Sequence, residues 1–299
     1  DSRHPGSWRS GAPTPGTANA PVFTENAAPL IDTVSHWPFQ PRSKDSVAIE
    51  AVVFDADGID TVTLQYQIVR PGDYIPYAYF GGPDNRVLNS AYEEGWVDVP
   101  MVAVDDEGVL FRGDIPSDVQ VHRNLIRYRI VAVDNAGVSL QIPYADDPQP
   151  NFAYFVYDDV PAWTGSDRPG VTGPVTYDEE VMASLPVYHL IATAADVNES
   201  QYTYIDYMGA EAGWYQWTGA LVYDGVVYDH IWFRTRGWWS AYEWGKNKWK
   251  FDFNRGHGFQ ARDDNGAPYA ETWDKMNFSA CITPVDYNPH RGEQGMFEA

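Results

Sequence analysis

The chain has little cysteine, little positive charge and no long apolar run. Cys281 is its single cysteine, so no internal disulfide can form and the packed cores must be stable without cross-links. The 20 lysine and arginine residues face 42 aspartate and glutamate residues, which gives a formal net charge of -22. That charge repels a phosphate backbone, which argues against nucleic acid as a partner. No apolar stretch approaches the roughly 18 residues that cross a bilayer, so no membrane span is predicted.

Familiar catalytic motifs are also missing from the sequence. The seven histidines show no metal-ligand spacing, and no nucleophile elbow, Walker loop or dinucleotide-binding glycine motif occurs. Acidic turns at Asp55, Asp57 and Asp60, and at Asp105 and Asp106, contain oxygen ligands of the kind that Ca²⁺ prefers. They do not match the EF-hand calcium loop. Ordinary turn chemistry is the simpler interpretation of these aspartates, and Ca²⁺ is a second candidate.

Hydrophobic residues, at 44% of the 299 positions, suffice for one or two packed cores. Residues 1–28 have the Pro, Gly, Ser and Thr composition of a linker. From residue 29 to 158, short segments rich in β-branched and aromatic residues alternate with turn signals such as Asp57-Gly58. These predicted strands are residues 46–54, 62–69, 125–133, 138–142 and 152–157. Regular short strands of this kind predict an immunoglobulin-like or fibronectin-like β-sandwich.

A second linker, residues 159–184, precedes another β-rich segment that covers residues 185–299. The elements predicted in it are a buried strand (187–192), a short helix (193–201) and a hairpin (220–233). Thr193 is the expected N-cap of the helix. The hairpin turns at Asp224-Gly225, which is the strongest short-range hairpin signal. The fold class predicted for the whole chain is therefore mainly β.

The most informative feature of the sequence is its concentration of basic residues between positions 234 and 250. Arg234 and Arg236 lie two apart at the end of the hairpin, so their side chains point to one face of a strand. Lys246, Lys248 and Lys250 repeat with the same period in the next predicted strand, whose other face is aromatic. Neighbouring antiparallel strands lie close enough for both sets to converge on one anion. Guanidinium groups bind phosphate or carboxylate bidentately, so an anion site is predicted here.

Two other interpretations of these cations stay open. They fit a solvated strand face that pairs with the surplus carboxylates, and they also fit an edge strand protected by lysines. The aromatic residues around them suit stacking on sugar rings or a base, although core packing is their commoner use. This aromatic cluster consists of Trp214, Tyr215, Trp217, Trp232, Trp238, Trp239, Tyr242, Trp244 and Trp249.

The second segment resembles the CotH-type atypical protein kinases of secreted bacterial proteins and spore coats. The resemblance rests on the order of four parts: the strand 187–192, the hairpin around Asp224-Gly225, the segment Arg234-Thr-Arg236-Gly237 with Ser240, and the lysine-rich strand 246–253. It implies the N-terminal lobe of a kinase that uses ATP and Mg²⁺. The residues that would hold the nucleotide phosphates are Arg234, Arg236, Ser240, Lys246, Lys248 and Lys250.

Two further stretches resemble the domains that accompany such kinases. Residues 7–19 resemble the closing segment of a lamin-tail domain, and residues 143–157 resemble the exit of the β-sandwich that commonly lies between the two. Together these resemblances imply a piece of a secreted, extracellular or cell-surface multidomain protein. The catalytic base and the metal ligands would come from a C-terminal lobe, supplied by the remainder of the precursor or by another chain, and the substrate would be a protein.

Alone, this chain is expected to be inactive, so its status as an enzyme stays open. The alternative function is a non-catalytic extracellular surface or matrix protein with carbohydrate-binding or protein-binding β modules. A carbohydrate-active enzyme is the weakest candidate, because no carboxylate pair for glycoside hydrolysis stands out in the sequence.

Overall fold

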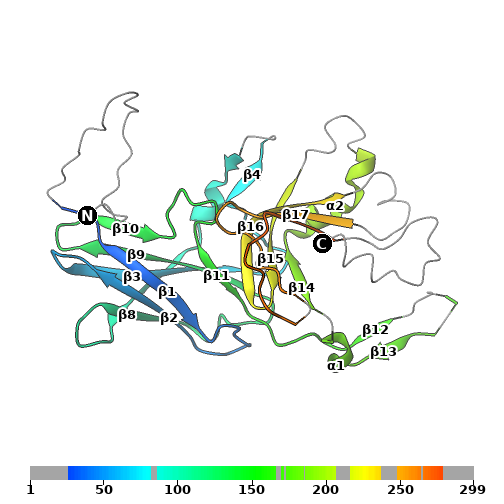
Figure 1. The fold of residues 1–299 in the computed structure, drawn as a ribbon, viewed down its shortest axis with the longest axis horizontal. Coiled ribbons are helices and arrows are strands. Elements are labelled where there is room, and N and C mark those ends of the chain that lie inside the picture. The colour runs from blue at the N-terminus through cyan, green and yellow to red at the C-terminus, as the bar shows by residue number, and fades with distance from the viewer. Residues whose placement is uncertain are drawn as a thin grey trace. The chain divides into compact units, whose positions relative to one another are not determined.

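The computed structural model describes residues 26–81, 86–165, 170–171, 173–184, 186–206, 216–236, 248–263 and 265–278, with the backbone alone for residues 201–206 and Arg236 (Figure 1). Within these ranges the protein is mainly β and consists of several antiparallel sheets, as the sequence predicts. The chain divides into two compact units. The first contains residues 1–68 and 95–157, and the second contains residues 69–94 and 158–299.

The first unit is a sandwich of two antiparallel sheets. Its strands are β1 (Leu30–Trp37), β2 (Val47–Phe54), β3 (Ile59–Val69), β6 (Val97–Pro100), β7 (Val102–Ala103), β8 (Leu110–Ile115), β9 (Leu125–Asp134), β10 (Ser139–Ile142) and β11 (Phe152–Phe155). One sheet has the order β1-β2-β8-β7, and the other has the order β10-β9-β3-β6, with β11 also paired to β9. An immunoglobulin module has strands A, B, E and D in one sheet and strands G, F and C in the other. The orders β1-β2-β8-β7 and β10-β9-β3 match these two sheets, so the strand order is immunoglobulin-like.

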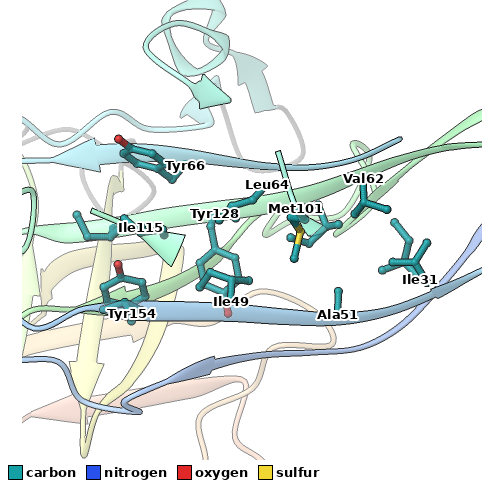
Figure 2. Close-up of a cluster of buried hydrophobic side chains, with 14 of the residues drawn as sticks. Ile31, Ile49, Ala51, Val62, Leu64, Tyr66, Met101, Ile115, Tyr128 and Tyr154 are labelled. Atoms are coloured by element: carbon teal, nitrogen blue, oxygen red, sulfur yellow. The ribbon is translucent and has the colours of Figure 1, made fainter. Parts of the chain in front are cut away.

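Alternate residues of the facing strands form the core of this sandwich. Ile49 and Ala51 on β2 share one buried cluster with Leu64 on β3 and Tyr128 on β9 (Figure 2). The period of two follows from strand geometry, because successive side chains point to opposite faces of a sheet. Full burial of one such aliphatic side chain contributes roughly 1.5–3 kcal/mol. Apolar burial is thus the main source of this unit's stability.

The second unit is centred on a five-stranded antiparallel sheet with the order β14-β15-β16-β17-β18 (Figure 1). Its elements are β14 (Tyr188–Ile191), α2 (Ala194–Asp206), β15 (Trp217–Tyr223), β16 (Val226–Arg236), β17 (Lys248–Asp252) and β18 (Lys275–Phe278). The predicted strand, helix and hairpin are confirmed. Thr193 Oγ1 accepts a hydrogen bond from the Asp196 amide at 3.0 Å, as an N-cap does. Asp224 and Gly225 have φ values of 50° and 77°, which a two-residue hairpin loop requires.

The segment that the sequence predicts as a second linker contains a small hairpin of its own. Strands β12 (Trp163–Gly165) and β13 (Val175–Tyr177) pair, and α1 (Glu179–Met182) follows them. The rings of Trp163 and Tyr177 stack across the hairpin with centroids 5.8 Å apart.

In the described part of the chain, no helix combines the length and the apolarity needed to cross a membrane.

Residues 69–94 lie between β3 and β6 in the sequence but belong to the second unit. We call this segment the insert. It contains β4 (Ala78–Phe80), β5 (Arg86–Leu88) and the 3₁₀ helix η2 (Ser90–Glu93). The sequence predicts a sandwich that runs without interruption from residue 29 to 158, and nothing in the composition of the insert indicates that it packs with the other unit.

Candidate anion-binding face of the second sheet

The two faces of the second sheet differ in their chemistry. One face carries the apolar core, where Phe233 on β16, Phe251 on β17 and Met276 on β18 are all buried. Helix α2 lies on this side, because Thr235 Oγ1 donates a hydrogen bond to the Ser200 carbonyl at 3.0 Å. Residues at the alternate positions of these strands must therefore project from the opposite face.

Most of the described tryptophans of the aromatic cluster pack in this core. Trp217 is buried in the core cluster, and half-buried Trp249 packs against it. The Trp217 indole N–H donates to Glu199 Oε2 at 2.9 Å. Trp232 alternates with Ile231 and Phe233, so it projects from the other face. The remaining members of the cluster lie outside the described residues.

The predicted basic residues meet on the face opposite the core. Arg234 pairs directly with Lys250 across β16 and β17, and position 236 pairs with Lys248. Directly opposed residues of an antiparallel pair project from the same face. The register thus brings four of the six predicted positions together. The other two, Ser240 and Lys246, lie outside the described residues.

Strand β17 is an interior strand, because it pairs with β16 on one side and with β18 on the other. The interpretation of its lysines as protection of an edge strand is therefore wrong. Strand β18 adds Lys275, opposite Asp252, and Asn277, opposite Lys250. The sequence does not predict β18, since residues 255–280 show single aromatic residues between turn signals. Its one available signal is the four-residue alternation of polar and apolar side chains.

Asp252 places a carboxylate among these cations. Lys250 Nζ lies 2.9 Å from Asp252 Oδ2, and Lys275 Nζ lies 3.8 Å from Oδ1. The Lys250 and Asp252 side chains are 19% and 14% exposed, so this ion pair is largely shielded from water. Asp252 Oδ1 itself is buried and has no hydrogen-bond partner within the described part of the chain. An anion that binds at Lys250 therefore competes with Asp252.

Arg234 differs from Lys250, because no described carboxylate lies within ion-pair distance of it. Its Nε is buried and has no hydrogen-bond partner among the described residues. Leaving a buried donor without a partner costs roughly 1–3 kcal/mol. Lys248 is half-buried and likewise forms no ion pair with a described carboxylate. Of the cations on this face whose side chains the structure describes, Arg234 and Lys248 are thus the two that form no ion pair with a described carboxylate.

The insert packs on this same face next to Arg234. Phe80 packs edge-on against Trp232 with ring centroids 5.8 Å apart, and the Arg86 guanidinium carbon lies 5.4 Å from the centroid of the Trp232 ring. Arg86 Nη2 also donates to Asn254 Oδ1 at 3.3 Å. A basic side chain from a distant part of the sequence therefore lies beside the predicted site.

A buried polar cluster anchors the insert to the sheet. The register of β15 and β16 shifts at a β-bulge that contains Asp229 and His230, and both residues are buried. The Tyr74 hydroxyl donates to Asp229 Oδ1 at 2.7 Å and accepts from the His230 amide at 3.0 Å. His230 Nδ1 accepts from the Tyr77 amide at 3.1 Å, so the neutral imidazole carries its proton on Nε2. These contacts fix the position of the insert on the sheet.

The described residues contain no group of three or more His, Cys, Asp or Glu side chains placed to share a metal ion. The turn aspartates bind backbone amides: Asp55 Oδ1 accepts from the Asp57 amide, and Asp105 Oδ1 accepts from the Val109 and Leu110 amides. On the cationic face, Asp252 lies between two lysines, which does not suit a Mg²⁺ ligand set. No step is therefore assigned to Mg²⁺ at this face.

Comparison with known proteins supplies no family for this chain. Models of known protein families do not match the sequence, and a search of curated proteins finds no significant match. The resemblance to CotH-type kinases and to lamin-tail domains therefore rests on the residues quoted for it.

Proposed function

We propose that the cationic face of the second sheet binds the phosphates of ATP, as the N-terminal lobe of a CotH-type kinase does, within a secreted or cell-surface multidomain protein. The observation that carries this proposal is the cross-strand pairing of Arg234 with Lys250 and of position 236 with Lys248. The Arg234 Nε, which has no hydrogen-bond partner among the described residues, supports it, because a phosphate oxygen is the strong acceptor that this donor lacks there.

The role proposed for this chain is to hold and orient the nucleotide phosphates. The Arg234 guanidinium donates hydrogen bonds to phosphate oxygens, while Lys248 and Lys250 offset their charge. Binding at Lys250 requires the ligand to replace Asp252, which holds that lysine at 2.9 Å. Phosphoryl transfer additionally needs a residue that positions the nucleophile and acidic metal ligands. In this proposal both come from the C-terminal lobe of the kinase family.

The second candidate is a non-catalytic surface protein that binds carbohydrate or protein partners. Exposed aromatic side chains favour it, because Trp37 is 74% exposed and Trp163 is 51% exposed. Such rings stack readily on sugar faces. A glycan array separates the two candidates: retention of specific glycans, without any affinity for ATP, supports this second function.

Titration calorimetry of ATP into the full chain and its Arg234→Gln variant tests the first proposal. Loss of a charge-assisted hydrogen bond costs roughly 1.5–3 kcal/mol, so we expect about tenfold to hundredfold weaker binding. Arg112→Gln is the matched control, because Arg112 is an exposed arginine of the first unit that pairs with Glu50 and Asp114. Equal affinities for all three proteins contradict the proposal.

A further inference from the structure

Arg86 is a cation of the second unit whose partners are neutral. Among the described residues it contacts Trp232 and Asn254 and forms no ion pair with a carboxylate. Partial burial lowers the pKa of its guanidinium. In a chain with a net charge of -22, such a cation is available to an external anion.

The position of Arg86 is set by buried neighbours. Asn254 is 1% exposed, and its amide nitrogen donates to the carbonyls of Asp229 and His230 at 3.0 and 3.1 Å. Its Oδ1 then accepts from Arg86. The guanidinium is thus held over Trp232 by a side chain that is itself fixed to the β-bulge.

The cations of this face form a row along the strands. Trp232 and Arg234 are alternate residues of β16, so their Cα atoms lie about 7 Å apart on the same face. Position 236 lies about 7 Å further on. Arg86 lies above Trp232, Arg234 lies beside Lys250, and Lys248 lies opposite position 236. The row therefore extends over more than about 13 Å. A single phosphate cannot contact both ends of this row, whereas a chain of phosphates can span much of it.

We propose that Arg86 of the insert completes the anion site and that the ligand of this site is a linear polyphosphate chain. This inference rests on the proposed function. It adds a contact from the insert, a part of the second unit that lies in the sequence between two strands of the sandwich. The triphosphate of a nucleotide and inorganic polyphosphate share the required chemistry.

The experiment compares the full chain with its Arg86→Gln, Arg86→Lys and Arg234→Gln variants. The probes are inorganic phosphate, inorganic triphosphate and ATP, each titrated by calorimetry at two salt concentrations. We expect Arg86→Gln to bind triphosphate about tenfold more weakly, with a weaker dependence on salt, and Arg86→Lys to recover part of the loss. Inorganic phosphate is too short to need Arg86, so its affinity should stay the same. Arg112→Gln again serves as the control.

The outcomes separate the inference from the function on which it rests. If Arg86→Gln binds triphosphate like the unchanged chain while Arg234→Gln does not, Arg86 is no part of the site. Equal weakening of phosphate and triphosphate by Arg86→Gln assigns Arg86 a structural role only and also overturns the inference. If the unchanged chain binds neither triphosphate nor ATP, the proposed function itself fails. Equal affinities for triphosphate and ATP identify the phosphate chain as the whole ligand, and tighter binding of ATP adds contacts to the nucleoside.

Discussion

The sandwich of the first unit and the sheet of the second unit use β structure differently. In the sandwich, two sheets bury their facing side chains in one shared core. In the second unit, one sheet buries an aromatic core on one face and carries cations and the insert on the other. Alternation along a strand therefore places apolar side chains in a core on one face and charged side chains on the other.

The contrast extends to electrostatics. The chain is strongly acidic as a whole, yet Arg86, Arg234, Lys248, Lys250 and Lys275 gather on or beside one face of one sheet. Because the summed charge repels anions, only a local concentration of cations with few carboxylates can bind one. A polyphosphate site in such a chain must therefore be local and specific.

The largest expected effect comes from removing a core side chain of either unit. Phe233→Ala should lower the free energy of unfolding of the second unit by about 3–5 kcal/mol and weaken triphosphate binding, because Phe233 supports the strand that carries Arg234. Leu64→Ala should lower the stability of the sandwich by about 2–5 kcal/mol and leave binding unchanged at temperatures where the protein stays folded. Urea unfolding and calorimetry measure both quantities. Loss of binding in folded Leu64→Ala would show that the core of the sandwich contributes to the anion site, contrary to this account.

The next effect concerns the anchor of the insert. Tyr74→Phe removes the hydroxyl that donates to buried Asp229 and accepts from the His230 amide, so the second unit should lose about 1–3 kcal/mol of stability. Tyr79→Phe is the control, because Tyr79 lies on the insert but is 51% exposed. We expect it to change stability by less than about 0.5 kcal/mol. Similar urea midpoints for the two variants would show that the cluster does not anchor the insert.

Removing the internal competitor for the lysines should strengthen binding. Asp252→Asn frees Lys250 and deletes a negative charge from the cationic face, so the affinity for triphosphate should rise about threefold to tenfold, or ~1 kcal/mol. Asp224→Asn makes the same charge change at an exposed turn that pairs with Arg262, and it should leave the affinity nearly unchanged. Weaker binding of magnesium-loaded ATP by Asp252→Asn would instead identify Asp252 as a metal ligand.

A separate effect is a dependence on alkaline pH. Burial and the neighbouring Tyr223 raise the pKa of Tyr188 from 10.0 to about 12. Between pH 10 and pH 12 the Tyr188 phenol has lost its proton in the unfolded chain and keeps it in the folded chain. The contribution of Tyr188 to the free energy of unfolding is therefore fully present below pH 10 and is lost as the pH rises toward 12. Tyr188→Phe should flatten the decline of the free energy of unfolding over this range. An identical decline in the variant would exclude Tyr188 as its source.

The sequence predicts elements whose signal is local. The Asp224-Gly225 turn, the Thr193 cap and the period of two around Arg234 each depend on residues close together in the chain, and the corresponding elements are present. The pairing of Arg234 with Lys250 also depends on the register of β16 against β17, which the period of two does not set. Strand β18 is too short and too irregular in sequence to give such a signal.

The packing of the insert against the second sheet could not be predicted from the sequence, because its contacts join residues that are far apart in the chain. Tyr74 and Asp229 are 155 residues apart, and neither carries a mark of its partner. Arg86 lies 168 residues from Asn254, within a stretch that the sequence places in the sandwich. Only the folded arrangement shows that these polar groups satisfy one another and that a cation of the insert lies beside the predicted site.

The most direct test of the central claim follows the Arg234 Nε–H group by nuclear magnetic resonance, with its signal assigned through its loss in Arg234→Lys. Addition of inorganic triphosphate should shift this signal in the direction of a stronger hydrogen bond. The Arg112 Nε–H signal, whose donor lies 3.3 Å from Asp114 Oδ1, should stay in place. An Arg234 signal that does not move at saturating triphosphate would contradict the proposed site.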